Sequence, residues 1–193
     1  MSFKLGNTNI GELYVGSTKI TQAYLGSTLV FQASTPAPTF DEVTIGTLTW
    51  MSKNLEIDDG GGGIIIVDNV TVNGINFGKQ YYYNWEAVQR IVSSLIGWRL
   101  PTVEEWITLT NTYSSNYCAD LRSTTGWNKS RPGTNATGLN VLPVGYYSGS
   151  SSMGKGNTGA FWCSTKYAMT IGVYGGEVQS GGSDYFSVRL IKI

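Results

Sequence analysis

The chain has 193 residues, and its 13 basic side chains balance its 13 acidic ones. Charged residues make up only 13% of the chain, about half of the usual share, so it lacks the basic surface that nucleic acid requires and we expect no nucleic-acid partner. The sequence has no histidine, which removes the commonest general base and metal ligand, and we expect no metal or other cofactor.

Residues 1–32 contain three copies of a ten-residue unit, which start at Phe3, Leu13 and Ala23. Each copy predicts a short strand, a turn around Gly-Asn-Thr or Gly-Ser-Thr, and a second short strand, because glycine permits the backbone of a tight turn. Three such units are too small to bury their apolar side chains alone, and stacking or oligomerisation solves this problem. We expect a docking or oligomerisation module, as a homotrimer or packed on a partner; the alternative is a β-meander on the main domain.

Two prolines within residues 33–39 predict an extended linker, which leaves residues 40–193 as the main domain. At its start, residues 43–51 predict a strand, a turn and a second strand. Residues 64–67 and 70–72 also favour strands, and Asn73-Gly74 is typical of a hairpin turn.

Two helices are predicted in the middle of the chain. Residues 85–96 place their apolar side chains on one helical face, with Asn84 as N-cap and Gly97 as terminator. A second helix is expected just after Pro101, where Thr102 and Glu105 have the spacing of a capping box. About 80 residues of glycine-rich, strand-like sequence follow, which indicates an α+β domain.

Five short phrases in the second half of the chain carry a resemblance to a known family. They are residues 97–102 (Gly-Trp-Arg-Leu-Pro-Thr), 105–106 (Glu-Trp), 142–146 (Leu-Pro-Val-Gly-Tyr), 161–165 (Phe-Trp-Cys-Ser-Thr) and 187–190 (Ser-Val-Arg-Leu). In this order they resemble the Fibrobacter succinogenes major paralogous domain, over about residues 43–193. That family is similar to the C-type-lectin-like fold and to the variable proteins of diversity-generating retroelements, which display changeable binding surfaces. The resemblance implies recognition without catalysis.

The resemblance also assigns framework roles to several residues. Arg99 is expected to pair with buried carbonyl groups or a carboxylate, and Arg189 to have a structural role in the last strand. The tryptophans are expected in the core rather than on a ligand platform; these are Trp50, Trp98, Trp106, Trp127 and Trp162.

Cys118 and Cys163 leave three alternatives open: a disulfide, two free thiols, or one buried and one exposed thiol. The rival enzymatic reading is a formylglycine-generating-like enzyme, which shares the broad fold but needs two reactive cysteines close together near the C-terminus. Here the two cysteines are 45 positions apart, and Cys163 stands where the resembled family usually has serine. Asp58 and Asp59 could offer oxygen ligands to calcium, but the lectin-type calcium motifs are missing.

The ligand-binding surface is expected between Tyr146 and Tyr185, where apolar residues are mixed with turn formers. In the resembled variable proteins this segment carries the diversified positions. The alternative is ordinary loops around a fixed core. The expected contact residues are Tyr147, Ser148, Lys155, Asn157, Phe161, Cys163, Lys166, Tyr167, Met169, Ile171, Val173, Tyr174 and Tyr185.

These expectations point to a phage receptor-binding or virion-decorating adhesin, because residues 1–32 also resemble N-terminal repeats in structural proteins of Bacteroidetes phages. The expected partners are a bacterial surface glycan or protein receptor, and virion proteins contacted through residues 1–32. No secretory signal and no membrane span is predicted, so we expect a virion or extracellular location. The alternatives are the enzyme above and a fixed cell-surface structural protein of a bacterium.

Overall fold

The computed structural model describes residues 38–128 and 130–193 in full, and within residues 1–32 it describes the backbone of six short strands. The chain forms two compact units, Met1–Ala37 and Pro38–Ile193. Residues 33–37 of the predicted linker lie outside the described residues.

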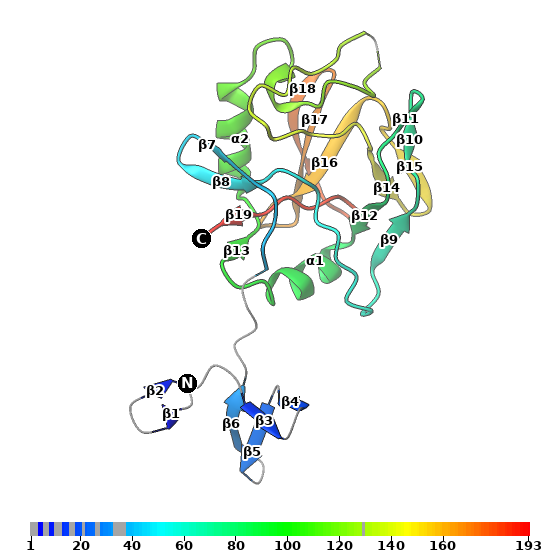
Figure 1. The fold of residues 1–193 in the computed structure, drawn as a ribbon. Coiled ribbons are helices and arrows are strands. Elements are labelled where there is room, and N and C mark those ends of the chain that lie inside the picture. Colours follow the sequence, from blue (N-terminus) through cyan, green and yellow to red (C-terminus); the bar gives the residue numbers. More distant parts are fainter. Residues whose placement is uncertain are drawn as a thin grey trace. The chain divides into compact units, whose positions relative to one another are not determined.

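The first unit consists of repeated hairpins (Figure 1). The same pairing recurs every ten residues: Leu5 faces Thr8, Val15 faces Thr18 and Leu25 faces Thr28. The two strands predicted for each repeat are therefore confirmed, while the predicted turns lie outside the described residues. The strands are β1 (Lys4–Leu5), β2 (Thr8–Asn9), β3 (Leu13–Val15), β4 (Thr18–Ile20), β5 (Gln22–Leu25) and β6 (Thr28–Gln32).

The described residues of the second unit form two α-helices, and their paired strands are antiparallel, which confirms the α+β class. Its helices are α1 (Trp85–Val92), α2 (Val103–Thr112) and a short 3-10 helix (Ala119–Leu121). Its strands are β7 (Glu42–Ile45), β8 (Leu48–Met51), β9 (Ile64–Val67), β10 (Thr71–Val72), β11 (Ile75–Asn76), β12 (Gln80–Tyr83), β13 (Trp98–Arg99), β14 (Tyr146–Ser148), β15 (Ser151–Met153), β16 (Thr158–Trp162), β17 (Tyr167–Gly172), β18 (Gly175–Ser180) and β19 (Ile191–Lys192).

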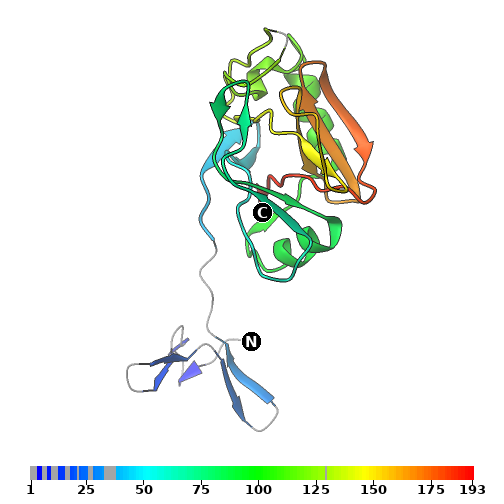
Figure 2. The same ribbon diagram turned by 90° about the vertical axis from the view of Figure 1, so that its right-hand side faces the viewer.

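Among the described residues of this unit, two sheets have more than two strands, and β10-β11, β12-β9 and β14-β15 form two-stranded sheets. The larger has the order β13-β19-β8-β7, so the last strand of the chain pairs with one of the first strands of the unit. The other has the order β16-β17-β18 and packs with one face on α2 (Figures 1 and 2). The β17–β18 turn and the loops that follow α2 lie at the same end of the unit (Figure 1).

Local sequence signals explain most element boundaries. Asn84 accepts the backbone N–H of Ala87 and caps α1, and Thr102 and Glu105 form the predicted capping box of α2. In the β10–β11 hairpin, Asn73 and Gly74 have φ angles of 50° and 79°, as the predicted turn requires.

Helix α1 is shorter than predicted, because it ends at Val92 rather than at residue 96. The hydroxyl groups of Ser93 and Ser94 donate to the carbonyls of Arg90 and Ile91, 2.8 and 2.7 Å away. The backbone N–H groups of Ser94 and Leu95 also donate hydrogen bonds to the carbonyls three residues earlier, those of Ile91 and Val92. These local bonds replace the helical ladder at its last turn.

The core confirms the predicted framework roles. All five tryptophans of the prediction are buried, and Trp162 donates its indole N–H to the carbonyl of Tyr83 at 2.7 Å. Arg99 forms a two-pronged ion pair with Glu105 at 2.6 and 2.9 Å. Within the described residues, no helix is long and apolar enough to cross a membrane.

Candidate functional site

The pairing of β16, β17 and β18 assigns each side chain to one of two faces. Paired residues of antiparallel strands share a face, and successive residues alternate between faces. Phe161 pairs with Met169, and Met169 pairs with Val178, so these three share the face that packs on α2. Ala160, Thr170 and Glu177 share the opposite face.

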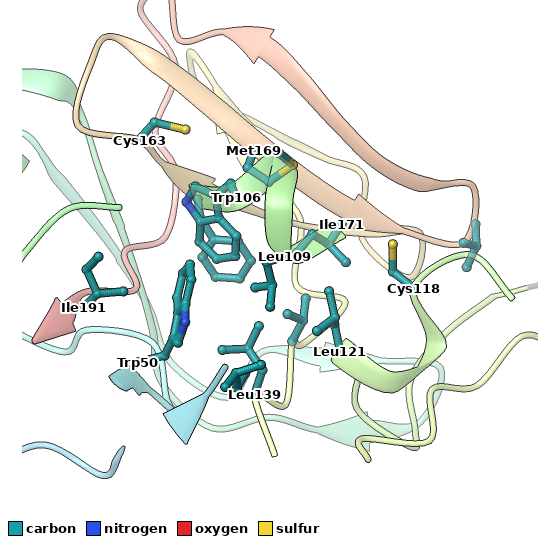
Figure 3. Close-up of a cluster of buried hydrophobic side chains, with 14 of the residues drawn as sticks. Trp50, Trp106, Leu109, Cys118, Leu121, Leu139, Cys163, Met169, Ile171 and Ile191 are labelled. Atoms are coloured by element: carbon teal, nitrogen blue, oxygen red, sulfur yellow. The ribbon is translucent and has the colours of Figure 1, made fainter. Parts of the chain in front are cut away.

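Five of the expected contact residues lie in the core, and the prediction that they form a contact surface is wrong. Each is at most 1% exposed, and Figure 3 shows Met169 and Ile171 beside Trp106 and Leu109 of α2. The segment Tyr167–Gly172 forms strand β17 rather than a loop, although turn-forming residues flank it. It carries apolar side chains on its covered face. The five are Phe161, Cys163, Met169, Ile171 and Val173.

The opposite face of this sheet is covered at one end only. There Trp162 and Ala168 are buried in a second cluster, which includes the inner side of α1. Towards the other end, the same face continues with Thr158 and Thr170, which are half-buried, and with Glu177, which is exposed. The sheet therefore leaves part of this face open to solvent.

A groove of about 460 Å³ occupies this open part. Thr158, Thr170 and Gly172 line it from strands β16 and β17, and Glu177 and Gln179 line it from β18. Tyr146 and Met153 of the β14–β15 hairpin line it as well, and so does Tyr174 of the β17–β18 turn. The groove thus combines aromatic rings, small side chains and planar polar groups.

Neighbouring loops fix the turn that contributes Asn157 to the groove. The side-chain amide of Asn128 donates to the amide oxygen of Asn157 at 3.2 Å, and that of Asn73 donates to Asn128 at 2.7 Å. A Cβ atom on Gly172 would lie 2.2 Å from the carbonyl oxygen of Asn157, so this close approach requires glycine. The groove is therefore braced at this edge.

A family model matches the main domain. The model of the Fibrobacter succinogenes major domain matches residues 43–192, which is more than half of the chain. The chain belongs to the Fibrobacter succinogenes major domain family. No curated protein and no solved structure matches the chain.

Within this Fibrobacter major domain, the groove collects only some of the expected contact residues. Asn157 and Tyr174 line it, Lys155 lies in the adjoining turn, and Ser148 is exposed at the end of β14. Alternation along β17 and β18 assigns Thr170, Glu177 and Gln179 to one face of the sheet, but it does not say that this face is the open one. The lining residues that the prediction missed are Tyr146, Met153, Thr158, Thr170, Glu177 and Gln179.

The other expected residues lie elsewhere on the domain. The ring of Tyr147 packs edge-on against Tyr82, with 5.0 Å between the ring centres, and its backbone bonds to Tyr185. Tyr146, its neighbour on β14, instead packs on Phe186. Lys166 and Tyr167 are exposed where β17 begins, at the opposite end of the strand from the groove-lining Gly172.

The two cysteines are free and buried. They lie on opposite sides of the core cluster in Figure 3. Burial raises the pKa of both thiols, that of Cys163 to about 12. The pKa of a reactive thiolate is normally lowered rather than raised.

We expect both thiols of the folded protein to resist iodoacetamide at neutral pH, because the raised pKa values keep them protonated and burial blocks access. Mass spectrometry of the labelled protein would measure this, with the unfolded chain in denaturant as the fully labelled control. Rapid labelling of either cysteine in the folded protein would contradict the assignment of buried thiols.

Asp58 and Asp59 of the glycine-rich loop accept hydrogen bonds from groups of the protein itself. Asp59 accepts from Arg90 at 2.5 and 2.8 Å, and these bonds lower the pKa of Asp59 to about 2. Asp58 accepts the backbone N–H of Gly60 at 2.9 Å. Asp59 therefore holds this loop to α1.

Proposed function

We propose that this chain is a non-catalytic ligand-binding protein, and that it serves a phage as a receptor-binding or virion-decorating adhesin. The groove on the open face of the β16-β17-β18 sheet would hold a glycan or protein receptor of a bacterial surface. A virion or extracellular location belongs to the same proposal. The observation that carries it is the groove itself, with its mixed aromatic and polar lining.

The lining suits binding better than chemistry. Tyr146 and Tyr174 offer rings on which an apolar face of a ligand can pack, while Asn157 and Gln179 offer both donors and acceptors. Glu177 contributes the single carboxylate among the residues that line the groove. Hydrolysis of a glycosidic bond ordinarily uses two carboxylates, so this lining favours recognition over cleavage.

We also propose a C-type-lectin-like fold for residues 40–193, with a surface that a diversity-generating retroelement could vary. The two-faced sheet supports this idea. Met169 and Ile171 hold the core from one face of β17, while Thr170 and Glu177 point to the groove from the other. Groove residues could therefore change without loss of the core packing.

Residues 1–32 would attach the protein to the virion or to other copies of the chain. Their described strands form three separate two-stranded sheets, and an isolated two-stranded hairpin is at best marginally stable in water. Association as a homotrimer, or packing on virion proteins, would supply the missing contacts. A trimer would also raise the avidity for a repeated surface ligand.

Replacing both Tyr174 and Gln179 by alanine should abolish binding of the labelled full chain to host cells within a panel of Bacteroidetes strains. Both side chains line the groove, and neither belongs to a core cluster, so the melting temperature should change little. Flow cytometry would measure binding. The matched variant Tyr167→Ala removes another exposed ring outside the groove and should bind normally. Normal binding by the double variant would refute the proposed site.

A further inference from the structure

The loop after α2 contains a strained turn. Asn116, Tyr117 and Cys118 have φ angles of 47°, 57° and 59°, so three consecutive residues other than glycine adopt the left-handed conformation. Such residues normally occur singly, and each costs about 1–3 kcal/mol. Backbone strain of this kind gathers at ligand-binding sites, where the surrounding structure holds it in place.

Two buried groups hold the turn. Arg122 is fully buried and donates to the carbonyl of Asn116 at 3.3 Å. The thiol of Cys118 is buried and donates to the carbonyl of Thr110 at 3.7 Å. The turn consequently presents Tyr117 outward, with 43% of this residue exposed.

Arg131 lies over the exposed ring of Tyr117. Its guanidinium carbon is 4.2 Å from the ring centre, a distance typical of a cation–π contact. One Nη atom donates to the carbonyl of Val173 at 2.8 Å. The guanidinium plane is thus fixed before any ligand arrives.

Arg131 contacts a residue that lies next to the groove. Val173 accepts from Arg131 through its carbonyl, and its N–H donates to the carbonyl of Asn157 at 2.9 Å. Asn157 and Tyr174, the residue that follows Val173, both line the groove. A ligand that fills the groove and extends past the β17–β18 turn would therefore meet Arg131.

The charge around Arg131 is not balanced within the described residues. Lys53, Lys79, Arg90, Arg99 and Lys192 each pair with a carboxylate there. Arg131 has no carboxylate partner in this part of the chain, and neither has the buried guanidinium of Arg122. Arg122 donates to the backbone carbonyl of Arg131 at 2.6 Å; burial lowers the pKa of Arg122, and the nearby positive charge of Arg131 lowers it further. An anionic group on the ligand would complement them.

We propose, resting on the proposed function, that Tyr117 and Arg131 form an anion subsite at the end of the groove. The ligand is then an acidic sugar polymer. A carboxylate or phosphate group on it accepts hydrogen bonds from the guanidinium N–H groups of Arg131, and Tyr117 holds the guanidinium in the required plane.

The test is an NMR titration of the full chain with three probes at equal concentrations: glucuronate, glucose 6-phosphate and glucose. We expect the charged probes to shift the backbone and side-chain N–H signals of Arg131 and the amide signals of Tyr117 and Tyr174. Glucose should leave the Arg131 signals in place. The relative size of the two charged responses separates a carboxylate from a phosphate ligand.

Arg131→Gln should lose these shifts while keeping the dispersion of a folded spectrum. The control Lys53→Gln removes the same charge outside the groove and should keep them, because Lys53 pairs with Asp41. Equal responses to glucuronate and glucose, or no response up to the solubility limit, would overturn the anion subsite. The proposed function fails separately, if the variant with alanine at 174 and 179 still binds host cells.

Discussion

Met169→Ala should lower the free energy of unfolding by about 2–5 kcal/mol, the usual cost of truncating a buried methionine. Met169 is 1% exposed and belongs to the core cluster with Trp106 and Leu109. Tyr174→Ala should change this free energy by less than about 0.5 kcal/mol, because Tyr174 is 68% exposed. Denaturant unfolding of both variants would measure the difference.

Met169→Leu is the matched control, since it keeps the apolar volume and should cost less than about 1.5 kcal/mol. A nearly neutral Met169→Ala would place this residue on the surface, as the sequence analysis expected. In that case the assignment of the two faces of β17 would be wrong, and the groove would lose its basis.

Arg189→Met should have an even larger effect on stability, with a loss of about 4 kcal/mol or more. The guanidinium of Arg189 is fully buried and donates to Asn54 Oδ1 at 2.8 Å. It also donates to the carbonyls of Met51, Leu139 and Asn140 at 2.5–3.1 Å. Methionine would leave these acceptors buried without donors, at about 1–3 kcal/mol each.

Chemical denaturation would measure this loss. Arg189→Lys is a second variant that keeps the positive charge but lacks the several N–H donors of the guanidinium. Burial lowers the pKa of Arg189 to about 9, so below that pH the group is charged in the folded and unfolded states alike. The loss should therefore not vary with pH around neutrality. Wild-type stability of Arg189→Met would mean that Arg189 is not the framework residue described above.

Local signals in the sequence were sufficient for much of the fold. The Asn73-Gly74 hairpin and the capping box of Thr102 and Glu105 depend on residues a few positions apart, so short-range chemistry determines them. The end of α1 was not predictable in this way. The hydroxyl groups of Ser93 and Ser94 bind backbone carbonyls there in place of helical N–H groups. The spacing of apolar residues, on which the helix prediction was based, contains no information about these bonds.

The contact residues were harder to predict, because exposure on β17 depends on distant segments. Helix α2 covers one face of the strand, and the cluster with α1 covers only part of the other. The sequence of β17 alone does not say which side chains these helices reach, so Met169 was placed outside and Thr170 was missed. The left-handed turn at 116–118 contains no glycine and gave no signal either.

The most direct test of the central claim is to fill the groove. Thr170→Arg would place a long side chain on the open face of β17, while Thr165→Arg makes the same change in the exposed turn before that strand. Both variants should keep the wild-type melting temperature, and only Thr170→Arg should lose binding to host cells. If Thr170→Arg folds and binds as well as Thr165→Arg, the groove is not the binding surface.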